Sequence, residues 1–305
     1  MTASKIYDVI IVGGSYAGLS AAMALGRSMR RVLIIDSGLP CNRQTPHSHN
    51  LITHDGATPK EIAEKARAQV LNYPTVKLHQ GVAVSGRKDQ ASFTITTQAG
   101  AEFEGRKLIF ATGIQDLLPA IRGFSECWGI SVIHCPYCHG YEFRGQKTGI
   151  MAPAEKALHL IPLIYNLTGS LRIFPSGPAE FNADQLARLQ QHSIEVIEKE
   201  IVEIVHEQGR LRRVILDDGS DVQLDALYAS VPFRQHTDLP AALGCQLNEQ
   251  GYIQVNDFQQ TTVPDVFACG DNSSPMRSVA SAIAKGNFVG AVVNKELADA
   301  DFWSN

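Results

Sequence analysis

The 305-residue sequence contains no long apolar run and no excess of basic residues. The apolar strand pattern from Ile6 to Val12 is too short for the core of a signal peptide or for a membrane span. Twenty-seven lysines and arginines stand against 31 aspartates and glutamates, a net charge of -4. Such a balance offers no cationic surface for nucleic acid or anionic lipid. We therefore expect a cytoplasmic protein that binds neither nucleic acid nor membranes.

Cysteine is scarce, and of the six cysteines only Cys135 and Cys138 form a close pair. The others, Cys41, Cys127, Cys245 and Cys269, are scattered, and we expect them to be core or loop residues. A closed zinc site needs two further ligands, usually from a second close pair, and the sequence has none. We therefore predict no metal site. A Cys-x-x-Cys pair opens and closes a disulfide at little conformational cost, so it is suited to two-electron chemistry.

The N-terminal region has the pattern of a dinucleotide-binding unit. A buried-type strand at 8–12 leads into Gly13-Gly14-Ser15-Tyr16-Ala17-Gly18, then a helical stretch at 19–29 and a strand at 31–35 that ends at Asp36. Gly13 and Gly18 hold the first and third glycine positions of the fingerprint, whereas Ser15 replaces the second. Serine is small, and its hydroxyl can bond a phosphate oxygen. Asp36 is placed to accept hydrogen bonds from a ribose.

The rest of the chain alternates between strand and helix patterns, which is typical of an α/β protein with two domains. The expected elements are a helix at 59–71, β-rich sequence at 82–103, a strand at 108–110 closed by Ala111-Thr112-Gly113, a second strand–turn–helix from 149, helical spacing from 184, hairpin strands at 214–227, a glycine-terminated strand at 266–271 and a helix at 279–297. The stretch 40–59, rich in proline and histidine, is irregular and long enough to be functional.

These segments, in this order, resemble the low-molecular-weight thioredoxin reductases along nearly the whole chain. The residues that carry the resemblance are 13–18, 111–113, the Cys135–Cys138 pair and Phe267-Ala268-Cys269-Gly270-Asp271. The resemblance implies an α/β fold of two Rossmann-like, three-layer ββα domains, the second inserted into the first. It implies an FAD-binding domain at 1–117 plus 241–305, a pyridine-nucleotide-type domain at 118–240, and a homodimer.

The resemblance also implies which residues bind FAD. Asp271 bonds the ribityl chain, and the last helix begins beside the pyrimidine edge of the flavin, where a helix N-terminus favours the negative charge of the reduced ring. Cys138 faces flavin C4a and Cys135 exchanges with substrate. The complete set of implied FAD-binding residues is Gly13, Ser15, Ala17, Gly18, Asp36, Asn50, Val82, Ala111, Thr112, Gly113, Gly270, Asp271, Ser278, Val279 and Ala280.

Two departures from the family pattern bear on function. His139 stands where the family usually has a catalytic aspartate, and histidine is suited to taking a thiol proton near neutral pH. In the inserted domain the turn that should hold NADPH reads Ala152-Pro153-Ala154-Glu155, without a glycine and with a carboxylate that repels phosphate. The stretch Pro175-Ser176-Gly177-Pro178 supplies no arginine for a 2′-phosphate. NADPH binding is therefore doubtful.

Three functions stay open. The first is oxidation of a dithiol, in which electrons pass through Cys135–Cys138 and FAD to O₂, as in a branch of the family that contains small-molecule dithiol oxidases. The second is a disulfide reductase that acts on a thioredoxin-like protein and takes electrons from NADPH, ferredoxin or another donor. The third is a flavin redox sensor without turnover. Phe302 and Trp303 either stack over the flavin or belong to a frayed terminus.

Overall fold

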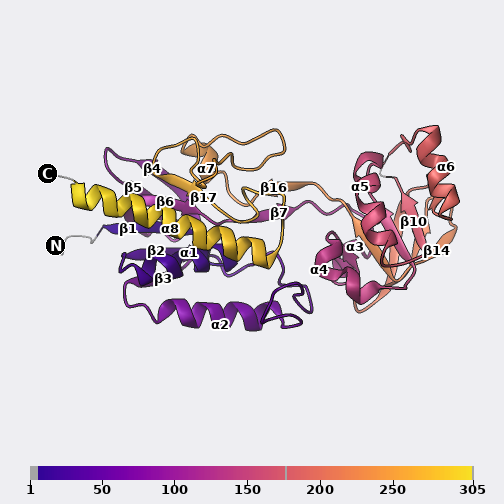
Figure 1. Cartoon of the computed structure of the whole chain (residues 1–305), viewed down its shortest axis with the longest axis horizontal. Helices are drawn as coiled ribbons and strands as arrows, with labels where there is room; N and C mark the ends of the chain where they lie inside the picture. The colour runs from indigo at the N-terminus through magenta and orange to yellow at the C-terminus, as the bar shows by residue number, and fades with distance from the viewer. Residues whose placement is uncertain (1–5, 176, 304–305) are drawn as a thin grey trace. The chain divides into compact units, whose positions relative to one another are not determined.

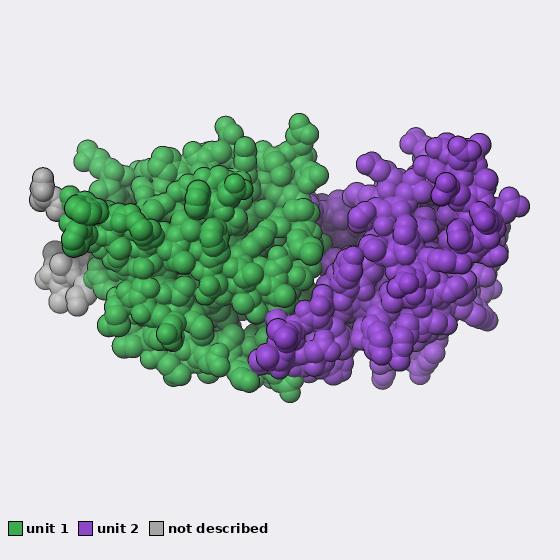
Figure 2. All heavy atoms as spheres, viewed as in Figure 1, with its two compact units in different colours: residues 1–43, 60–115, 234–305 green, residues 44–59, 116–233 purple. Residues whose placement is uncertain are grey.

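The chain divides into two compact units, which Figure 2 colours separately. The computed structural model describes residues 6–175 and 177–303, so Met1–Lys5, Ser176, Ser304 and Asn305 lie outside it. Unit 1 comprises residues 1–43, 60–115 and 234–305, and unit 2 comprises residues 44–59 and 116–233. The sequence places the main boundaries after residues 117 and 240. The segment 44–59 groups with unit 2 although unit 1 flanks it on both sides.

Unit 1 is built on a mostly parallel sheet with the strand order β3-β2-β1-β6-β5-β4, in which β17 also pairs with β6. The strands are β1 (Tyr7–Val12), β2 (Val32–Asp36), β3 (Val76–Gln80), β4 (Ala83–Lys88), β5 (Phe93–Thr97), β6 (Glu102–Phe110) and β17 (Val266–Ala268). The helices are α1 (Tyr16–Arg27), α2 (Pro59–Leu71), α7 (Leu239–Ala242) and α8 (Val279–Trp303) (Figure 1). The short strands β7 (Ile114–Asp116) and β16 (Phe233–Gln235) pair where the chain passes between the units.

Both faces of this sheet are buried, which explains why its central strands are apolar throughout. Along β1, Val9 and Ile11 face a core formed with α1, α2 and α8. Ile10 and Val12 face the opposite core, which is closed by β4, β5 and the chain around α7. Side chains alternate across a strand, so one apolar run supplies two cores. Helices therefore cover one face of the sheet, and the other core is closed by residues of β4 and β5, at the far end of the same sheet, together with the chain around α7.

Helix α8 packs closely against α1 and extends further than the sequence suggests. A Cβ at Gly286 would lie 2.1 Å from the carbonyl oxygen of Ala17, so only glycine permits this crossing. Of the two alternatives for Phe302 and Trp303, fraying is wrong, because α8 continues to Trp303 and Asp301 binds Arg30 and Arg106 at 2.5 and 2.7 Å. With a rise of about 1.5 Å per residue, Trp303 lies roughly 36 Å from the start of the helix.

Unit 2 holds a parallel sheet with the order β11-β10-β9-β15-β8 and an antiparallel sheet β12-β13-β14. Its strands are β8 (Val132–Ile133), β9 (Thr148–Met151), β10 (Leu171–Phe174), β11 (Glu195–Val196), β12 (Ile201–Glu207), β13 (Arg210–Leu216), β14 (Asp221–Gln223) and β15 (Ala226–Ala229). Its helices are α3 (Phe124–Cys127), α4 (Pro136–His139), the 3-10 helix η1 (Gly140–Phe143), α5 (Ala154–Tyr165) and α6 (Ala183–Gln191).

The parallel sheet of unit 2 is also covered on both faces. Ile150 and Ile173 pack with α5 and α6, whereas Phe174 and Leu227 pack with the antiparallel sheet. Like unit 1, unit 2 has helices on one face of its parallel sheet, but its other face is covered by a separate antiparallel sheet. The predicted fold of two Rossmann-like units, the second inserted into the first, is confirmed. Within residues 6–175 and 177–303, no helix combines the length and apolar character that crossing a membrane requires.

Candidate functional site

In unit 1 the turns predicted to bind a dinucleotide meet at one edge of the sheet. Strands β2, β1, β6 and β17 are parallel neighbours, so their carboxyl ends lie together. The turns that follow them carry most of the predicted residues: Ser15, Ala17 and Gly18 after β1, Asp36 at the end of β2, Ala111–Gly113 after β6, and Gly270 and Asp271 after β17. Ligands of open parallel sheets bind at such an edge.

The start of α1 has the features of a phosphate site. A Cβ at Gly18 would lie 1.9 Å from the carbonyl oxygen of Gly13, so the turn requires glycine there. Ser15 is the N-cap residue, and its side chain makes no capping hydrogen bond. Among the described residues, the N–H groups of Ser15, Ala17 and Gly18 have no acceptor. Unpaired N–H groups at a helix N-terminus bind anions, so the turn fits the pyrophosphate of FAD.

Asp36 both shapes this turn and faces a neighbouring cation. One carboxylate oxygen accepts the N–H of Gly14 at 2.9 Å, and the other lies 3.6 Å from Nη2 of Arg67. The second oxygen keeps acceptor capacity for a ribose hydroxyl. The backbone oxygen of Asp36 accepts the N–H of Gly81 at 2.8 Å, which holds Val82 beside the same edge. Val82 is 44% exposed.

Asn272 was missed by the sequence reasoning, although it holds two of these turns together. Its side-chain Nδ2 donates to the carbonyl oxygen of Phe110 at 2.8 Å and to Oγ1 of Thr112 at 3.1 Å. The residue is completely buried. The only signal for Asn272 in the sequence was its position directly after Asp271. In the structure, a carboxylate oxygen of Asp271 lies 3.9 Å from Nε of Arg277.

The start of α8 leaves backbone donors available, as predicted for the flavin edge. Oγ of Ser278 accepts the N–H of Ser281 at 3.1 Å and so caps the helix. Among the described residues, the N–H groups of Val279 and Ala280 have no acceptor. A negative charge beside them would be stabilised by the helix N-terminus.

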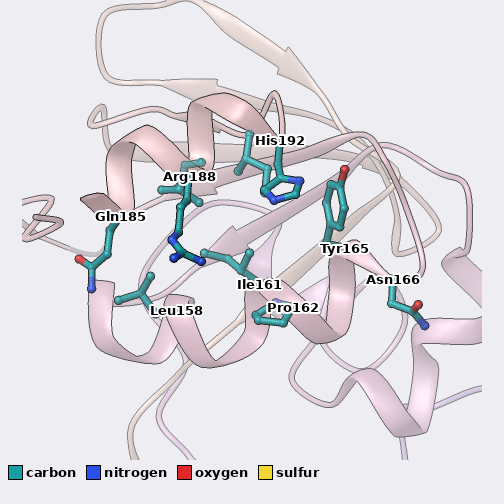
Figure 3. Close-up of a pocket in the computed structure, with 10 residues that line it drawn as sticks. Leu158, Ile161, Pro162, Tyr165, Asn166, Gln185, Arg188 and His192 are labelled. Carbon is teal, nitrogen blue, oxygen red and sulfur yellow. The ribbon is translucent and has the colours of Figure 1, made fainter. Parts of the chain in front are cut away.

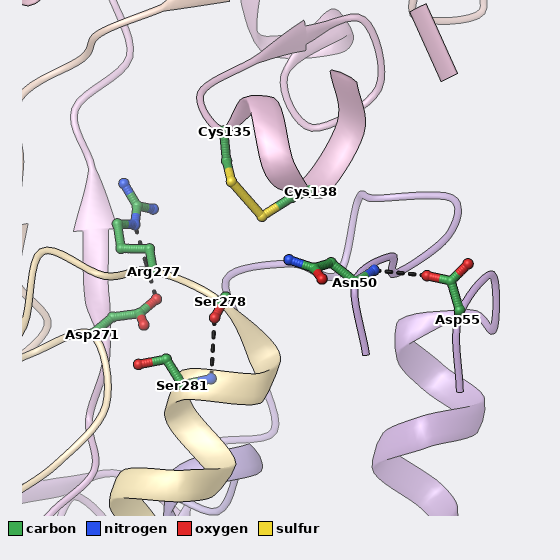
Figure 4. Close-up of a disulfide and its surroundings, with 8 residues drawn as sticks. All are labelled: Asn50, Asp55, Cys135, Cys138, Asp271, Arg277, Ser278 and Ser281. Carbon is green, nitrogen blue, oxygen red and sulfur yellow. Dashed lines mark hydrogen bonds and ion pairs between the residues drawn. A yellow bond between two sulfur atoms is a disulfide. The ribbon is translucent and has the colours of Figure 1, made fainter. Parts of the chain in front are cut away.

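The Cys-x-x-Cys pair of unit 2 is closed as a disulfide (Figure 4). The Cα atoms of Cys135 and Cys138 are 5.3 Å apart. Cys135 is the N-cap residue of α4, Pro136 begins that helix, and the carbonyl oxygen of Cys135 accepts the N–H groups of Cys138 and His139 at 3.3 Å. One turn of helix therefore fixes both sulfurs in bonding range.

The buried cysteines outside this pair are poor redox groups. Burial raises the pKa of the Cys127 thiol to about 11 and that of the Cys269 thiol to about 12. Cys245 is also buried, and burial raises its pKa too. Since the thiolate is the reactive form, these three buried thiols are poorly suited to exchange with the Cys135–Cys138 disulfide.

His139 lies beside the disulfide in an environment that keeps its imidazole neutral. Burial, together with the charge of His49, lowers the pKa of His139 to about 4. Nε2 of His49 lies 3.6 Å from Oε1 of Glu142, the third residue of η1. The imidazole of His139 is therefore neutral at pH 7, with one ring nitrogen able to donate a hydrogen bond and the other able to accept one. The cluster of His49, His139 and Glu142 was not predicted as a set, because it joins residues far apart in the sequence.

Asn50 is the one predicted FAD-binding residue that lies in unit 2. It has a positive φ of 58°, and its N–H donates to Oδ1 of Asp55 at 2.7 Å, as Figure 4 shows. All the other predicted FAD-binding residues lie in unit 1.

The corresponding turn of unit 2, between β9 and α5, differs from the turn before α1 in the residues that would face a phosphate. Pro153 is the N-cap residue of α5 and has no N–H, and Glu155 adds a carboxylate to the first turn. Ala152 is completely buried and Ala154 is 8% exposed, so their methyl groups pack into the core. In the stretch 175–178, which contains no arginine, Ser176 lies outside the described residues.

A cavity of about 410 Å³ opens between α5 and α6 (Figure 3). Apolar and polar side chains line it together, and the rings of Tyr165 and His192 contact each other with centroids 4.9 Å apart. None of its lining residues belongs to α4, to η1 or to the turn at 152–155. The cavity is therefore separate from the dithiol within unit 2.

Comparisons with known proteins agree with this geometry. The profile of the pyridine nucleotide-disulphide oxidoreductase family matches residues 7–286. The chain belongs to this family. It is 32% identical to thioredoxin reductase tcpT of Claviceps purpurea over 308 residues, which cover 97% of this chain and 96% of that protein. An oxidoreductase structure from Agrobacterium tumefaciens is 36% identical with a TM-score of 0.90, over 96% of this chain and 99% of the other.

A thioredoxin reductase structure from Bacillus anthracis, described as putative, has a TM-score of 0.92 at 28% identity and covers 97% of this chain and 100% of its own. Family membership makes the chain a thioredoxin reductase-like, FAD-dependent disulfide oxidoreductase. The unpaired N–H groups at the start of α1 fit that cofactor. In this family FAD supplies a two-electron carrier between a disulfide and a second redox partner.

Proposed function

We propose that this pyridine nucleotide-disulphide oxidoreductase oxidises a dithiol substrate, passing two electrons through Cys135–Cys138 to FAD and then to O₂. The observation that carries the proposal is the contrast between two equivalent turns. The turn before α1 needs glycine at position 18 and carries no acidic residue, whereas the turn before α5 has no glycine and places Pro153 at the N-cap and Glu155 in the first turn of the helix. An enzyme that keeps its disulfide and flavin site without a nicotinamide site needs another redox partner.

In the proposed reaction, the substrate's first thiolate attacks the sulfur of Cys135. The Cys135–Cys138 bond breaks, and Cys138 leaves as a thiolate with the electron pair of that bond. The second substrate thiolate then attacks the substrate sulfur of the mixed disulfide, and Cys135 leaves. The substrate ends as a disulfide, and the two cysteines hold its two electrons. Bound FAD would supply the two-electron carrier between the Cys138 thiolate and O₂, the terminal acceptor, which would leave as H₂O₂ with the two protons.

His139 is assigned the proton transfers of this cycle. Its neutral imidazole takes the proton of a substrate thiol, so that the attacking group is the thiolate. The family aspartate that it replaces would carry a negative charge, which disfavours a thiolate nearby. The substrate is proposed to be a small-molecule dithiol, with a thioredoxin-like protein as the other class, and the active form a homodimer.

Anaerobic titration of the bound flavin tests this proposal. We expect dithiothreitol to bleach the flavin absorbance near stoichiometry and NADPH to leave it unchanged. Admission of air should restore the absorbance and produce H₂O₂. Rapid bleaching by NADPH would overturn the assignment and support the second function, a thioredoxin reductase-type reaction, which the names of the relatives favour.

The variants C135S and C138S locate the electron path. Both should lose dithiol-dependent O₂ consumption, whereas C127S, which removes a buried thiol outside the pair, should keep it. Turnover that survives in C138S would show that substrate electrons reach the flavin by another route. A flavin that no dithiol reduces would favour a redox sensor.

A further inference from the structure

Arg67 of α2 lies beside Asp36, the residue predicted to bind a ribose of FAD. Its Nη2 is 3.6 Å from Oδ2 of Asp36, and the two side chains are 42% and 15% exposed. The other carboxylate oxygen of Asp36 accepts the N–H of Gly14 at 2.9 Å, and a Cβ at Gly14 would lie 2.8 Å from that of Asp36. Arg67 is therefore linked through one side chain to the turn that fits a pyrophosphate.

The hydrogen bonds of Arg67 are incomplete among the described residues. Its Nε is buried and has no acceptor there. Buried donors in proteins normally have a partner, and a guanidinium group holds its five N–H donors in a fixed fork. A buried donor that protein atoms leave unsatisfied, next to a residue predicted to bind the cofactor, indicates that an atom of the cofactor is its acceptor.

Both members of this pair stand on well-packed parts of unit 1. Val70, three residues after Arg67, is 1% exposed, and Ala66 packs against the core that α1 and β2 share. Asp36 ends β2, and its backbone oxygen accepts the N–H of Gly81 at 2.8 Å. Binding residues on rigid elements keep their geometry more precisely than residues on loops.

We propose that Arg67 is a cofactor-binding residue: its guanidinium group pairs with Asp36 and donates through Nε to the adenosine half of FAD. In parallel sheets of this kind, the acidic residue at the end of the second strand binds the ribose next to adenine. A donor beside that residue therefore faces the same half of the cofactor. The role requires the FAD that the family uses, and it is independent of the proposed direction of electron flow.

The charge of Arg67 acts in the direction that binding needs. The pyrophosphate of FAD is negatively charged, so the carboxylate of Asp36 alone would repel it. A cation 3.6 Å from that carboxylate offsets its charge. The carboxylate still has acceptor sites for ribose hydroxyls, because its two oxygens offer about four of them. The ion pair thus allows an acidic residue to stand beside an anionic cofactor.

The rate at which the purified full chain releases FAD tests this role, followed by flavin fluorescence after dilution. R67M should release FAD about five- to twentyfold faster, because a charged donor is lost. R67K keeps the charge but lacks the Nε donor, so its release should be about two- to fivefold faster. The matched control is R87M, which removes an arginine of β4 that pairs with Glu102 at 3.4 Å and should leave the rate unchanged.

A double-mutant cycle and an unfolding measurement separate binding from a structural role. In D36N, the added effect of R67M on the release rate should be at least about twofold smaller than in the unsubstituted chain, since one of its two contacts is already weakened. The urea midpoint of the flavin-free chain should be equal in R67M and R87M, because both remove a partly exposed ion pair.

Three results would overturn the inference. An unchanged release rate in R67M would mean that water satisfies Nε. Faster release together with a lower urea midpoint of the flavin-free R67M chain would assign Arg67 to the fold. Equal effects of R67M with and without D36N would show that the two residues act separately.

These measurements do not depend on the proposed function. If dithiols fail to reduce the flavin but R67M releases FAD faster, the proposed function fails and the role of Arg67 stands. If dithiol turnover occurs and the release rate is unchanged, the role of Arg67 fails alone.

Discussion

Nδ2 of Asn272 donates to the carbonyl oxygen of Phe110 at 2.8 Å and to Thr112 at 3.1 Å, which joins the turn after β6 to the turn after β17. Both turns carry residues proposed to bind FAD. In N272A the carbonyl group of Phe110 loses its side-chain donor in a fully buried place. We expect the free energy of unfolding, measured with urea, to fall by about 1–3 kcal/mol and bound flavin to be lost more readily on dialysis.

N287A is the control for this substitution. Asn287 lies on the exposed side of α8 and makes no side-chain hydrogen bond to the described residues. Its replacement should change the free energy of unfolding by less than about 0.5 kcal/mol. Equal effects of N272A and N287A would mean that the buried amide does not hold the turns together.

The turn before α1 should tolerate no side chain at Gly18. A Cβ there would lie 1.9 Å from the carbonyl oxygen of Gly13, a backbone atom that cannot rotate away. G18A should therefore displace the N–H groups proposed to bind pyrophosphate and reduce the flavin-to-protein absorbance ratio after purification at least tenfold. G169A adds a methyl group where no atom lies within 4 Å and should keep its flavin. Full flavin content in G18A would place the pyrophosphate elsewhere.

Lys107 joins three segments of unit 1 through one buried ammonium group. Its Nζ lies 2.6 Å from both Asp265 and Glu296, and the residue is 7% exposed. K107M should lower the free energy of unfolding by about 1–3 kcal/mol; the cost stays below that of a fully buried pair because both carboxylates reach solvent. D301A, which removes an exposed partner of Arg30 and Arg106, should cost about 1 kcal/mol or less. Chemical denaturation of both variants at one pH measures the difference.

Short sequence patterns correctly predicted several helices and strands of unit 1. The helix expected at 59–71 has those bounds in the structure, and the strands expected before Gly13 and Gly270 are β1 and β17. Apolar runs and glycine-terminated strands report directly on backbone conformation, so such elements are readable without tertiary information. The patterns indicated an α/β protein with two domains, and the resemblance to the thioredoxin reductases implied that both are Rossmann-like.

The features that were missed depend on residues distant in the sequence. Helix α8 continues to its end because Asp301 binds Arg30, 271 residues away, which no local pattern reveals. The segment 44–59 joins unit 2 through the pairing of His49 with Glu142. The role of Asn272 needs two strands to be neighbours before its amide has a partner. Tertiary contacts override local propensity in each case.

The depressed pKa of His139 makes the stability of unit 2 depend on pH in a predictable direction. The pKa is about 4 in the folded chain, below the ordinary value of 6.5, so the unfolded chain binds the proton first as the pH falls. The contribution of neutral His139 to the free energy of unfolding is therefore complete above pH 6.5 and is lost as the pH falls from 6.5 to 4.

Between pH 7.5 and pH 5, this group alone should lower the free energy of unfolding by about 2 kcal/mol, and H139N should lack that loss. Urea unfolding of the oxidised protein, followed by the fluorescence of Trp128 in the core of unit 2, measures it. H159N, which replaces an exposed histidine of α5, should behave as the unsubstituted protein does. An equal loss in H139N would mean that His139 titrates normally in the folded chain, and its role as a neutral proton acceptor would then have to be abandoned.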